Sequence, residues 1–202
     1  MTNYKQANNA QQQMINVSQF SPWVRQIINW LVIVGSVLIC LMILPTRLPG
    51  MEVLGIAPNW LLIWVVAWSL KRSAFQGVVA GVALGLIQDG MTSPYPGLTD
   101  HFPSHIYSLA LVGYLTGRIQ KQRYIQEDFI SVALIVFGMA VIGETVTAIQ
   151  YSLIGDRTLA EIWTDHQRIA LSSAILSSLW APVVYYPLNR WWERLNMIDQ
   201  SS

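Results

Sequence analysis

Apolar residues form long runs along most of the chain, and short polar segments separate these runs. Six of them follow a polar beginning that is rich in Asn and Gln. Each run is long enough, or nearly so, to cross the hydrocarbon core of a bilayer as a helix. Their approximate bounds are 23–44, 53–70, 73–88, 103–119, 129–154 and 169–187. The pattern therefore predicts an all-α, polytopic integral membrane protein that folds as a compact bundle of six transmembrane helices.

The two ends of the chain differ from its middle. Residues 1–22 lack the basic-then-apolar layout of a cleaved signal peptide, so we expect a polar, disordered N-terminal tail. Residues 23–195 form the expected six-helix transmembrane domain, and residues 196–202 form a C-terminal tail. Within the last span, Pro182 predicts a kink. Pro58 lies in or just before the first turn of the second span, where a missing N–H is harmless.

The segment between the last two spans carries a helical signal of its own. Thr158 and Glu161 have capping-box spacing, and the apolar residues that follow Thr158 share one helix face. We interpret this segment as a short helix that lies on the outer surface of the membrane.

The charges support a membrane protein and predict its orientation. The chain is 53% hydrophobic and 11% charged, whereas a soluble domain carries about 25% charged residues. With the N-terminus in the cytoplasm, only three of the 12 Lys and Arg residues fall outside, namely Arg47, Arg157 and Arg168. This positive-inside pattern predicts that both termini are cytoplasmic. The net charge of +1, without a dense basic tract, argues against nucleic-acid binding.

Small residues define two expected packing faces. Gly77, Gly81 and Gly85 recur every fourth residue and form a bare stripe on a helix. In lipid, small residues at this spacing let helix backbones approach closely. Ser173 and Ser177 give the sixth span a second small-residue face, which we expect to meet the glycine stripe.

Four polar residues fall within or at the start of the apolar spans. They are Asp89, His105, Glu144 and Thr147, all in the outer half of the predicted bundle. Ionisable groups at membrane depth usually face the bundle interior or a water-filled cavity. For Asp89 we favour a structural hydrogen-bond cluster and expect it to approach the turn at 103–108. For Glu144 we favour a polar cavity or a partner contact.

Tryptophans at helical spacing mark the second span. Trp60, Trp64 and Trp68 form an i, i+4, i+8 stripe. Such a stripe is a binding face for a partner helix, a packing ridge or a lipid-facing ridge, and the sequence leaves these alternatives open.

Signatures of enzymes and cofactor sites are missing from the sequence. It has no G-x-S-x-G elbow, no H-E-x-x-H and no P-loop. His101 and His105 are four residues apart, but Pro103 lies between them, so we do not expect a metal site. Cys40 is the single cysteine and sits inside an apolar run. We therefore predict no enzyme activity and no cofactor.

The glycine span resembles a known family. The run from Gly77 through Gly81 and Gly85 to Asp89 is similar to the rod shape-determining protein MreD family. Three further positions fit the same pattern: Pro58, Gly97 and Gly117. The resemblance extends over nearly all of the chain apart from its tails.

This resemblance implies a location and a set of partners. It implies a bacterial inner-membrane subunit of the cell-elongation machinery, without chemistry of its own. The partners implied are MreC by direct binding, and MreB, the RodA glycosyltransferase and a class B penicillin-binding protein as members of one complex. The family is also similar in span number and shape to the S-components of energy-coupling-factor vitamin transporters. The alternative function is therefore a small-molecule binding subunit of a membrane transporter, with the four polar residues lining its pocket.

Overall fold

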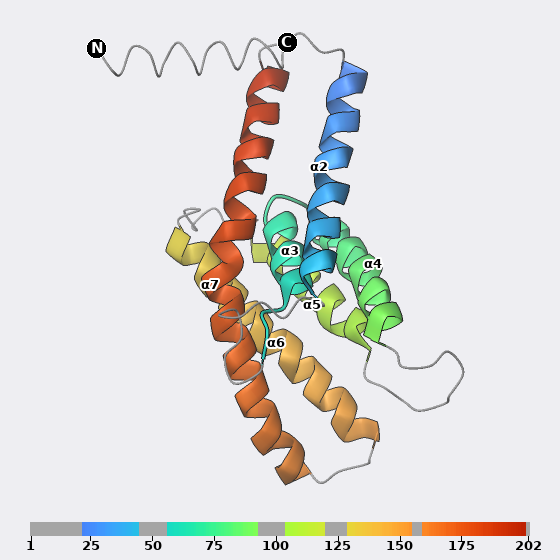
Figure 1. Cartoon of the computed structure of the whole chain (residues 1–202), viewed down its shortest axis with the longest axis vertical. Coiled ribbons are helices and arrows are strands. Elements are labelled where there is room, and N and C mark those ends of the chain that lie inside the picture. Colours follow the sequence, from blue (N-terminus) through green and yellow to red (C-terminus); the bar gives the residue numbers. More distant parts are fainter. Residues whose placement is uncertain (1–21, 45–55, 93–103, 120–128, 155–158, 201–202) are drawn as a thin grey trace.

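The computed structural model describes residues 22–44, 56–92, 104–119, 129–154 and 159–200. These residues form six helices (Figure 1): α2 Pro22–Ile43, α3 Trp60–Ser69, α4 Ala74–Thr92, α5 His105–Ile119, α6 Phe129–Ile154 and α7 Leu159–Gln200. Four of them, α2, α4, α6 and α7, are long and apolar enough to cross a membrane. The predicted N-terminal tail before residue 22 lies outside the described residues, as does most of the proline-rich loop that precedes α5.

Helix α3 forms the centre of the protein. All but one of its ten residues are buried, and it contacts each of α2, α4, α5, α6 and α7. Asn59 caps the helix by accepting the N–H of Leu62 at 3.0 Å. Ten residues rise only about 15 Å, half of the roughly 30 Å hydrocarbon core. The predicted second span, 53–70, is therefore wrong in length within the described residues, because the cap starts the helix at Trp60.

Helices α4 and α5 pack backbone to backbone. A Cβ atom added at Gly77 would overlap the carbonyl group of Gly113, and one added at Gly81 would overlap the carbonyl group of Leu109. A Cβ at Gly85 would lie 2.5 Å from a Cα atom in the first turn of α5. The glycine stripe is thus filled by α5, and only glycine permits this approach.

The second small-residue face has a different neighbour from the one expected. The glycine stripe meets α5, so the expected contact between this stripe and the Ser173–Ser177 face is wrong. Both serines are buried, and the hydroxyl of Ser177 accepts the backbone N–H of Asn59 at 3.0 Å. The Ser177 hydroxyl thereby joins α7 to the start of α3.

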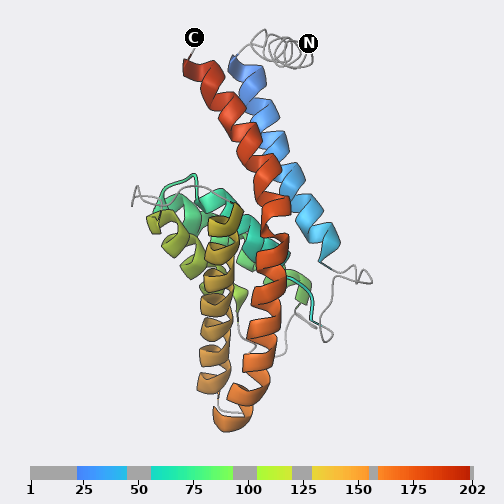
Figure 2. The same ribbon diagram turned by 90° about the vertical axis from the view of Figure 1, so that its left-hand side faces the viewer.

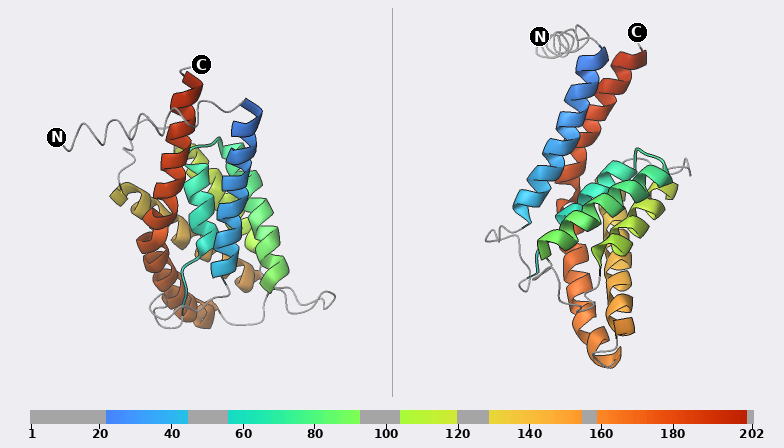
Figure 3. Two further views of the ribbon diagram at one scale, coloured as in Figure 1. Left: turned by 45° about the horizontal axis from the view of Figure 1, so that its top comes forward. Right: turned by 90° about the vertical axis from the view of Figure 1, so that its right-hand side faces the viewer.

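Helix α7 is one continuous element of 42 residues. It contains Pro182 and Pro187, and it absorbs both the predicted surface helix and the predicted sixth span. The separate surface helix is therefore wrong, because the helix that begins at Leu159 continues without interruption. It bends along its length, so that its first part packs on α6 and its last part runs beside α2 (Figure 2). The start of α2 and the end of α7 lie at the same end of the protein (Figure 3).

Candidate functional site

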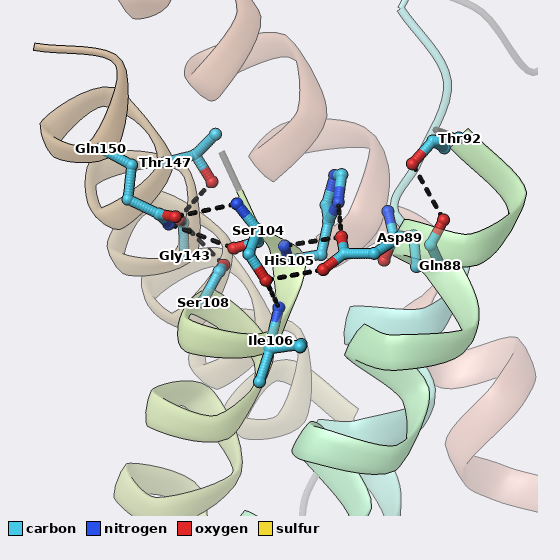
Figure 4. A network of polar contacts seen from close by, with 10 residues as sticks. All are labelled: Gln88, Asp89, Thr92, Ser104, His105, Ile106, Ser108, Gly143, Thr147 and Gln150. Carbon is cyan, nitrogen blue, oxygen red and sulfur yellow. Dashed lines mark hydrogen bonds and ion pairs between the residues drawn. The ribbon is translucent and has the colours of Figure 1, made fainter. Parts of the chain in front are cut away.

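A carboxylate on α4 holds the N-terminus of α5. Asp89 accepts the backbone N–H of His105 through Oδ1 at 2.8 Å and the hydroxyl of Ser104 through Oδ2 at 2.6 Å (Figure 4). Nδ1 of His105 lies 2.7 Å from the same Oδ1. The first N–H groups of a helix have no partner in the helix itself, and the helix dipole favours a negative charge there. Asp89 therefore caps α5 from a neighbouring helix.

Ser104 links this carboxylate to the helix that it caps. Its hydroxyl donates to Asp89 and accepts the backbone N–H of Ile106 at 3.2 Å. A serine at the N-cap position satisfies one of the unpaired donors of the first turn. Asp89 and Ser104 together thus supply partners for the first two N–H groups of α5.

A third helix reaches the same point through an amide. Gln150, on α6, accepts the backbone N–H of Ser104 through Oε1 at 2.8 Å and donates from Nε2 to the carbonyl of Ser104 at 3.1 Å. Both polar atoms of the Gln150 amide thus bond to the backbone of Ser104, as Figure 4 shows. Sequence reasoning missed Gln150, because a single amide in an apolar span has no partner at helical spacing to reveal it. Ser104 was missed individually, although the turn around it was predicted.

One backbone carbonyl on α6 serves two hydroxyls. The carbonyl of Gly143 accepts the buried hydroxyl of Ser108 at 3.0 Å and that of Thr147 at 3.2 Å. A Cβ atom at position 143 would lie 2.9 Å from the Ser108 hydroxyl and 3.2 Å from the side chain of Leu62. A methyl group at this position would therefore displace the Ser108 hydroxyl that makes this bond.

The structure brings together part of the predicted polar set. Asp89 and His105 are in direct contact, and the prediction that Asp89 approaches the 103–108 turn is confirmed. Thr147 is linked to α5 through the Gly143 carbonyl. Glu144 is half-buried on α6, one residue beyond that carbonyl. We call Asp89, Ser104, His105 and Gln150 the polar clamp, because they fasten α4, α5 and α6 at one point.

The hydrogen bonds of the polar clamp join α4, α5 and α6 to one another. Each carboxylate oxygen of Asp89 accepts at least one bond from the start of α5. The side chains of Asp89 and His105 are 26% and 30% exposed, so the pair is partly shielded. Within the described parts of the chain, no three His, Cys, Asp or Glu residues gather closely enough to hold a metal ion. The arrangement is that of a structural joint between helices.

Comparison with known protein families shows to which family the chain belongs. A family model for the rod shape-determining protein MreD matches residues 24–188. The chain belongs to the MreD family. No curated protein and no solved structure was found to match the chain. Membership in the MreD family assigns the chain to rod shape determination, a structural role in cell shape, and the matched region includes the whole polar clamp.

The tryptophan stripe of this MreD-family chain is a buried packing ridge. Trp60 and Trp64 are almost fully buried, and because the Trp64 side chain bonds to α2, the lipid-facing alternative is wrong for Trp64. The indole N–H of Trp64 donates to the hydroxyl of Ser36 on α2 at 2.8 Å. The ring of Trp60 packs against that of Trp180 on α7, with centroids 5.6 Å apart. The ridge thus joins α3 to the two outer helices.

A separate cavity lies beside this ridge. It has a volume of about 510 Å³ and is lined by α2, α7 and Trp60 of α3. Its lining includes Cys40 and is almost entirely apolar. The polar clamp contributes no residue to the lining, so the two features are distinct.

Proposed function

We propose that this chain is a noncatalytic inner-membrane subunit of the bacterial cell-elongation machinery. It binds MreC and helps to assemble or regulate a peptidoglycan-synthesising complex that includes MreB, RodA and a class B penicillin-binding protein. The family match over residues 24–188 carries this proposal, because it covers most of the chain.

The polar clamp supports a role in recognition over one in catalysis. A catalytic carboxylate needs access to a substrate and a proton that it can transfer in a suitable pose. Asp89 instead accepts a backbone N–H and a hydroxyl of its own chain. These bonds favour a scaffold whose helices are locked in place.

The same bonds argue against the transporter alternative at this site. A vitamin-binding pocket requires polar groups that point to a ligand. Asp89 and His105 point to each other, and Gln150 is engaged by the backbone of Ser104 (Figure 4). The scaffold proposal requires only that the outer surfaces of the helices stay available for another membrane protein.

Partner capture tests the proposal directly. A tagged chain, extracted in mild detergent from its own host, is expected to recover MreC, and depletion of the chain is expected to turn rod-shaped cells round. Recovery of ATP-binding-cassette ATPases with an uptake scaffold, without MreC, would contradict the proposal and support the transporter alternative.

A variant on α6 sharpens this test. Glu144→Ala changes a half-buried residue next to the Gly143 carbonyl. If Glu144 contacts the partner, the folded variant recovers less MreC. Thr145→Ala is the matched control, because the exposed Thr145 hydroxyl bonds the Val141 carbonyl of its own helix. Equal MreC recovery by both variants would show that Glu144 does not contribute to the contact with MreC.

The orientation is tested with reporters. Both termini are proposed to be cytoplasmic, supported by the positive-inside pattern and by the shared end of α2 and α7. Fusions of a periplasm-active reporter to either end are therefore expected to stay inactive. Activity at only one end would contradict the topology.

A further inference from the structure

The apolar cavity between α2 and α7 is open to the surroundings of the protein. Ile39 and Val183 both line it, and their side chains are 61% and 58% exposed. Its inner wall is formed by Trp60 and Trp180, whose rings pack against each other. Among the described side chains of α2 only that of Cys40 is fully buried, although Val32, Ile33 and Val37 are packed against the core, so one side of this helix faces outward. We refer to this feature as the α2–α7 groove.

The dimensions of the groove fit a hydrocarbon chain. On α2 the lining runs from Val32 to Ile43, which is about 16 Å at 1.5 Å per residue and close to half of the roughly 30 Å hydrocarbon core. Dividing about 510 Å³ by that length gives a mean cross-section of roughly 32 Å², which corresponds to a width of roughly 6 Å, whereas a helix with its side chains is about 10–12 Å wide. The groove therefore extends over about one leaflet and is narrower than a helix with its side chains.

The volume of the groove also fits a hydrocarbon chain. A protein cavity of about 150 Å³ holds one six-carbon benzene ring. The groove, at about 510 Å³, has room for roughly three times as many carbons, the size of a fatty acyl chain.

Arginines lie beyond the groove on both helices, toward the shared end of α2 and α7. On α7, Val183 and Pro187 line the groove, and Arg190 and Arg194 follow on the same helix face at i+7 and i+11 from Val183. Both arginines are exposed, and the guanidinium of Arg190 lies 5.9 Å from the centroid of the Tyr186 ring.

Helix α2 repeats the arrangement. Val32 lines the groove, and Arg25 precedes it by seven residues on the same face. Glu193, the carboxylate closest in sequence to Arg190 and Arg194, accepts a bond from the amide of Asn189 at 2.8 Å. Guanidinium groups bind phosphate with two parallel hydrogen bonds, and basic residues near the cytoplasmic surface attract anionic lipids.

We propose that the α2–α7 groove binds one anionic phospholipid of the cytoplasmic leaflet. One acyl chain lies in the groove against Trp60 and Trp180, and the phosphate lies beside Arg190 and Arg194. The lipid fills the space that separates the outer two helices from each other. It makes α2, which has few protein contacts, part of a continuous packed surface.

The first measurement uses the full chain in a bilayer of known composition. The protein is reconstituted into nanodiscs of equal phosphatidylglycerol and phosphatidylcholine, released into mild detergent, and weighed by native mass spectrometry. The expected result is one retained phospholipid, with phosphatidylglycerol preferred. Retention of no lipid, or equal retention of both lipids, would overturn the proposal.

Filling the groove tests the acyl-chain site. A Cβ atom at Gly35 meets nothing within 4 Å, and Gly35 lines the groove. Gly35→Leu is therefore expected to fold and to lose most of the retained lipid. Gly138→Leu on α6 is the matched control, because a Cβ there also meets nothing within 4 Å and Gly138 does not line the groove. If Gly35→Leu does not give a monodisperse protein, Ile39→Phe fills the same space from an exposed position.

Removing charge tests the headgroup site. Arg190→Gln is expected to lower the preference for phosphatidylglycerol by about fivefold, while one lipid is still retained. Arg118→Gln is the control, because the Arg118 guanidinium lies over Tyr114 at 5.8 Å, the same arrangement as that of Arg190 over Tyr186. An equal loss of preference in both variants would overturn the headgroup assignment.

Two other occupants of the groove give different results. If a partner's helix docks there, Gly35→Leu leaves the retained lipid unchanged and abolishes recovery of that partner. If a second copy of this chain docks there, the wild type gives a dimer mass that Gly35→Leu removes. Either result would overturn the lipid proposal without affecting the proposed role in cell elongation.

Discussion

The carboxylate of Asp89 accepts the backbone N–H of His105 at 2.8 Å, so a residue near the end of α4 caps the first residue of α5. This bond completes a pair of helices whose backbones are already in contact along the glycine stripe. The glycines set how closely the two helices lie, and the carboxylate sets their register. Several mutations separate these contributions.

Asp89→Ala is expected to lower the free energy of unfolding by about 1–3 kcal/mol, because it leaves the N–H of His105 and the hydroxyl of Ser104 without their acceptor. Asp89→Asn keeps one carbonyl oxygen, so its free energy of unfolding should lie between those of Asp89→Ala and the wild type. Detergent-solubilised protein unfolded with a chemical denaturant gives the measurement. Thr92→Val is the control, because the Thr92 hydroxyl bonds the Gln88 carbonyl of its own helix. Equal midpoints for Asp89→Ala and Thr92→Val would contradict the capping role.

Gly81→Ala is expected to destabilise the protein by about 1–3 kcal/mol or more, because the added methyl group overlaps the Leu109 carbonyl and forces α4 and α5 apart. Gly90→Ala is the control on the same helix. A Cβ atom at Gly90 meets nothing within 4 Å, so this change should be neutral or stabilising by up to about 1 kcal/mol. The thermal midpoint in mild detergent distinguishes the two. A Gly81→Ala protein as stable as Gly90→Ala would show that the stripe is not a packing face.

Ser177→Ala is expected to cost about 1–3 kcal/mol, because the Ser177 hydroxyl is buried and its loss leaves the half-buried N–H of Asn59 without its acceptor at the start of α3. Ser178→Ala removes an exposed hydroxyl that bonds the Ile175 carbonyl of its own helix, so it should change stability by less than about 0.5 kcal/mol. Unfolding of both variants under one condition tests the difference. If the neighbouring serines prove equivalent, the junction between α7 and α3 does not depend on this bond.

A double-mutant cycle measures the attachment of α2. Trp64→Phe and Ser36→Ala each remove one side of the 2.8 Å bond between the indole N–H and the hydroxyl. The two changes are expected to couple by about 1 kcal/mol, so the double variant is less destabilised than the sum of the single ones. Additive free energies would indicate that α2 is held by apolar contact alone.

The hydrophobic pattern predicted much of the fold because lipid imposes simple rules on length and composition. The helix expected at 129–154 is found at Phe129–Ile154, and the one expected at 23–44 is found at Pro22–Ile43. The glycine spacing predicted a close helix contact, and the carboxylate after it predicted a joint with the following turn. These signals are local, so a single sequence contains them.

The predictions were wrong or incomplete where a residue distant in the sequence determines the local structure. The apolar run at 53–70 has the composition of a span, but its helix starts only at Trp60, where Asn59 caps it and Ser177 fixes that cap from α7. The choice of α5 over α7 as the neighbour of the glycine stripe follows from topology, which spacing does not encode. Gln150 lies 46 residues from Ser104, and no periodicity connects the two.

The enclosed position of α3 has a consequence for biosynthesis. This helix leaves the ribosome before the four helices that later surround it, and it is too short to span the bilayer alone. Its set of packing neighbours is complete only once α7 has been made. A chain truncated before α7 therefore presents an incomplete core to the insertion machinery, and is expected to be degraded instead of accumulating as a partial scaffold.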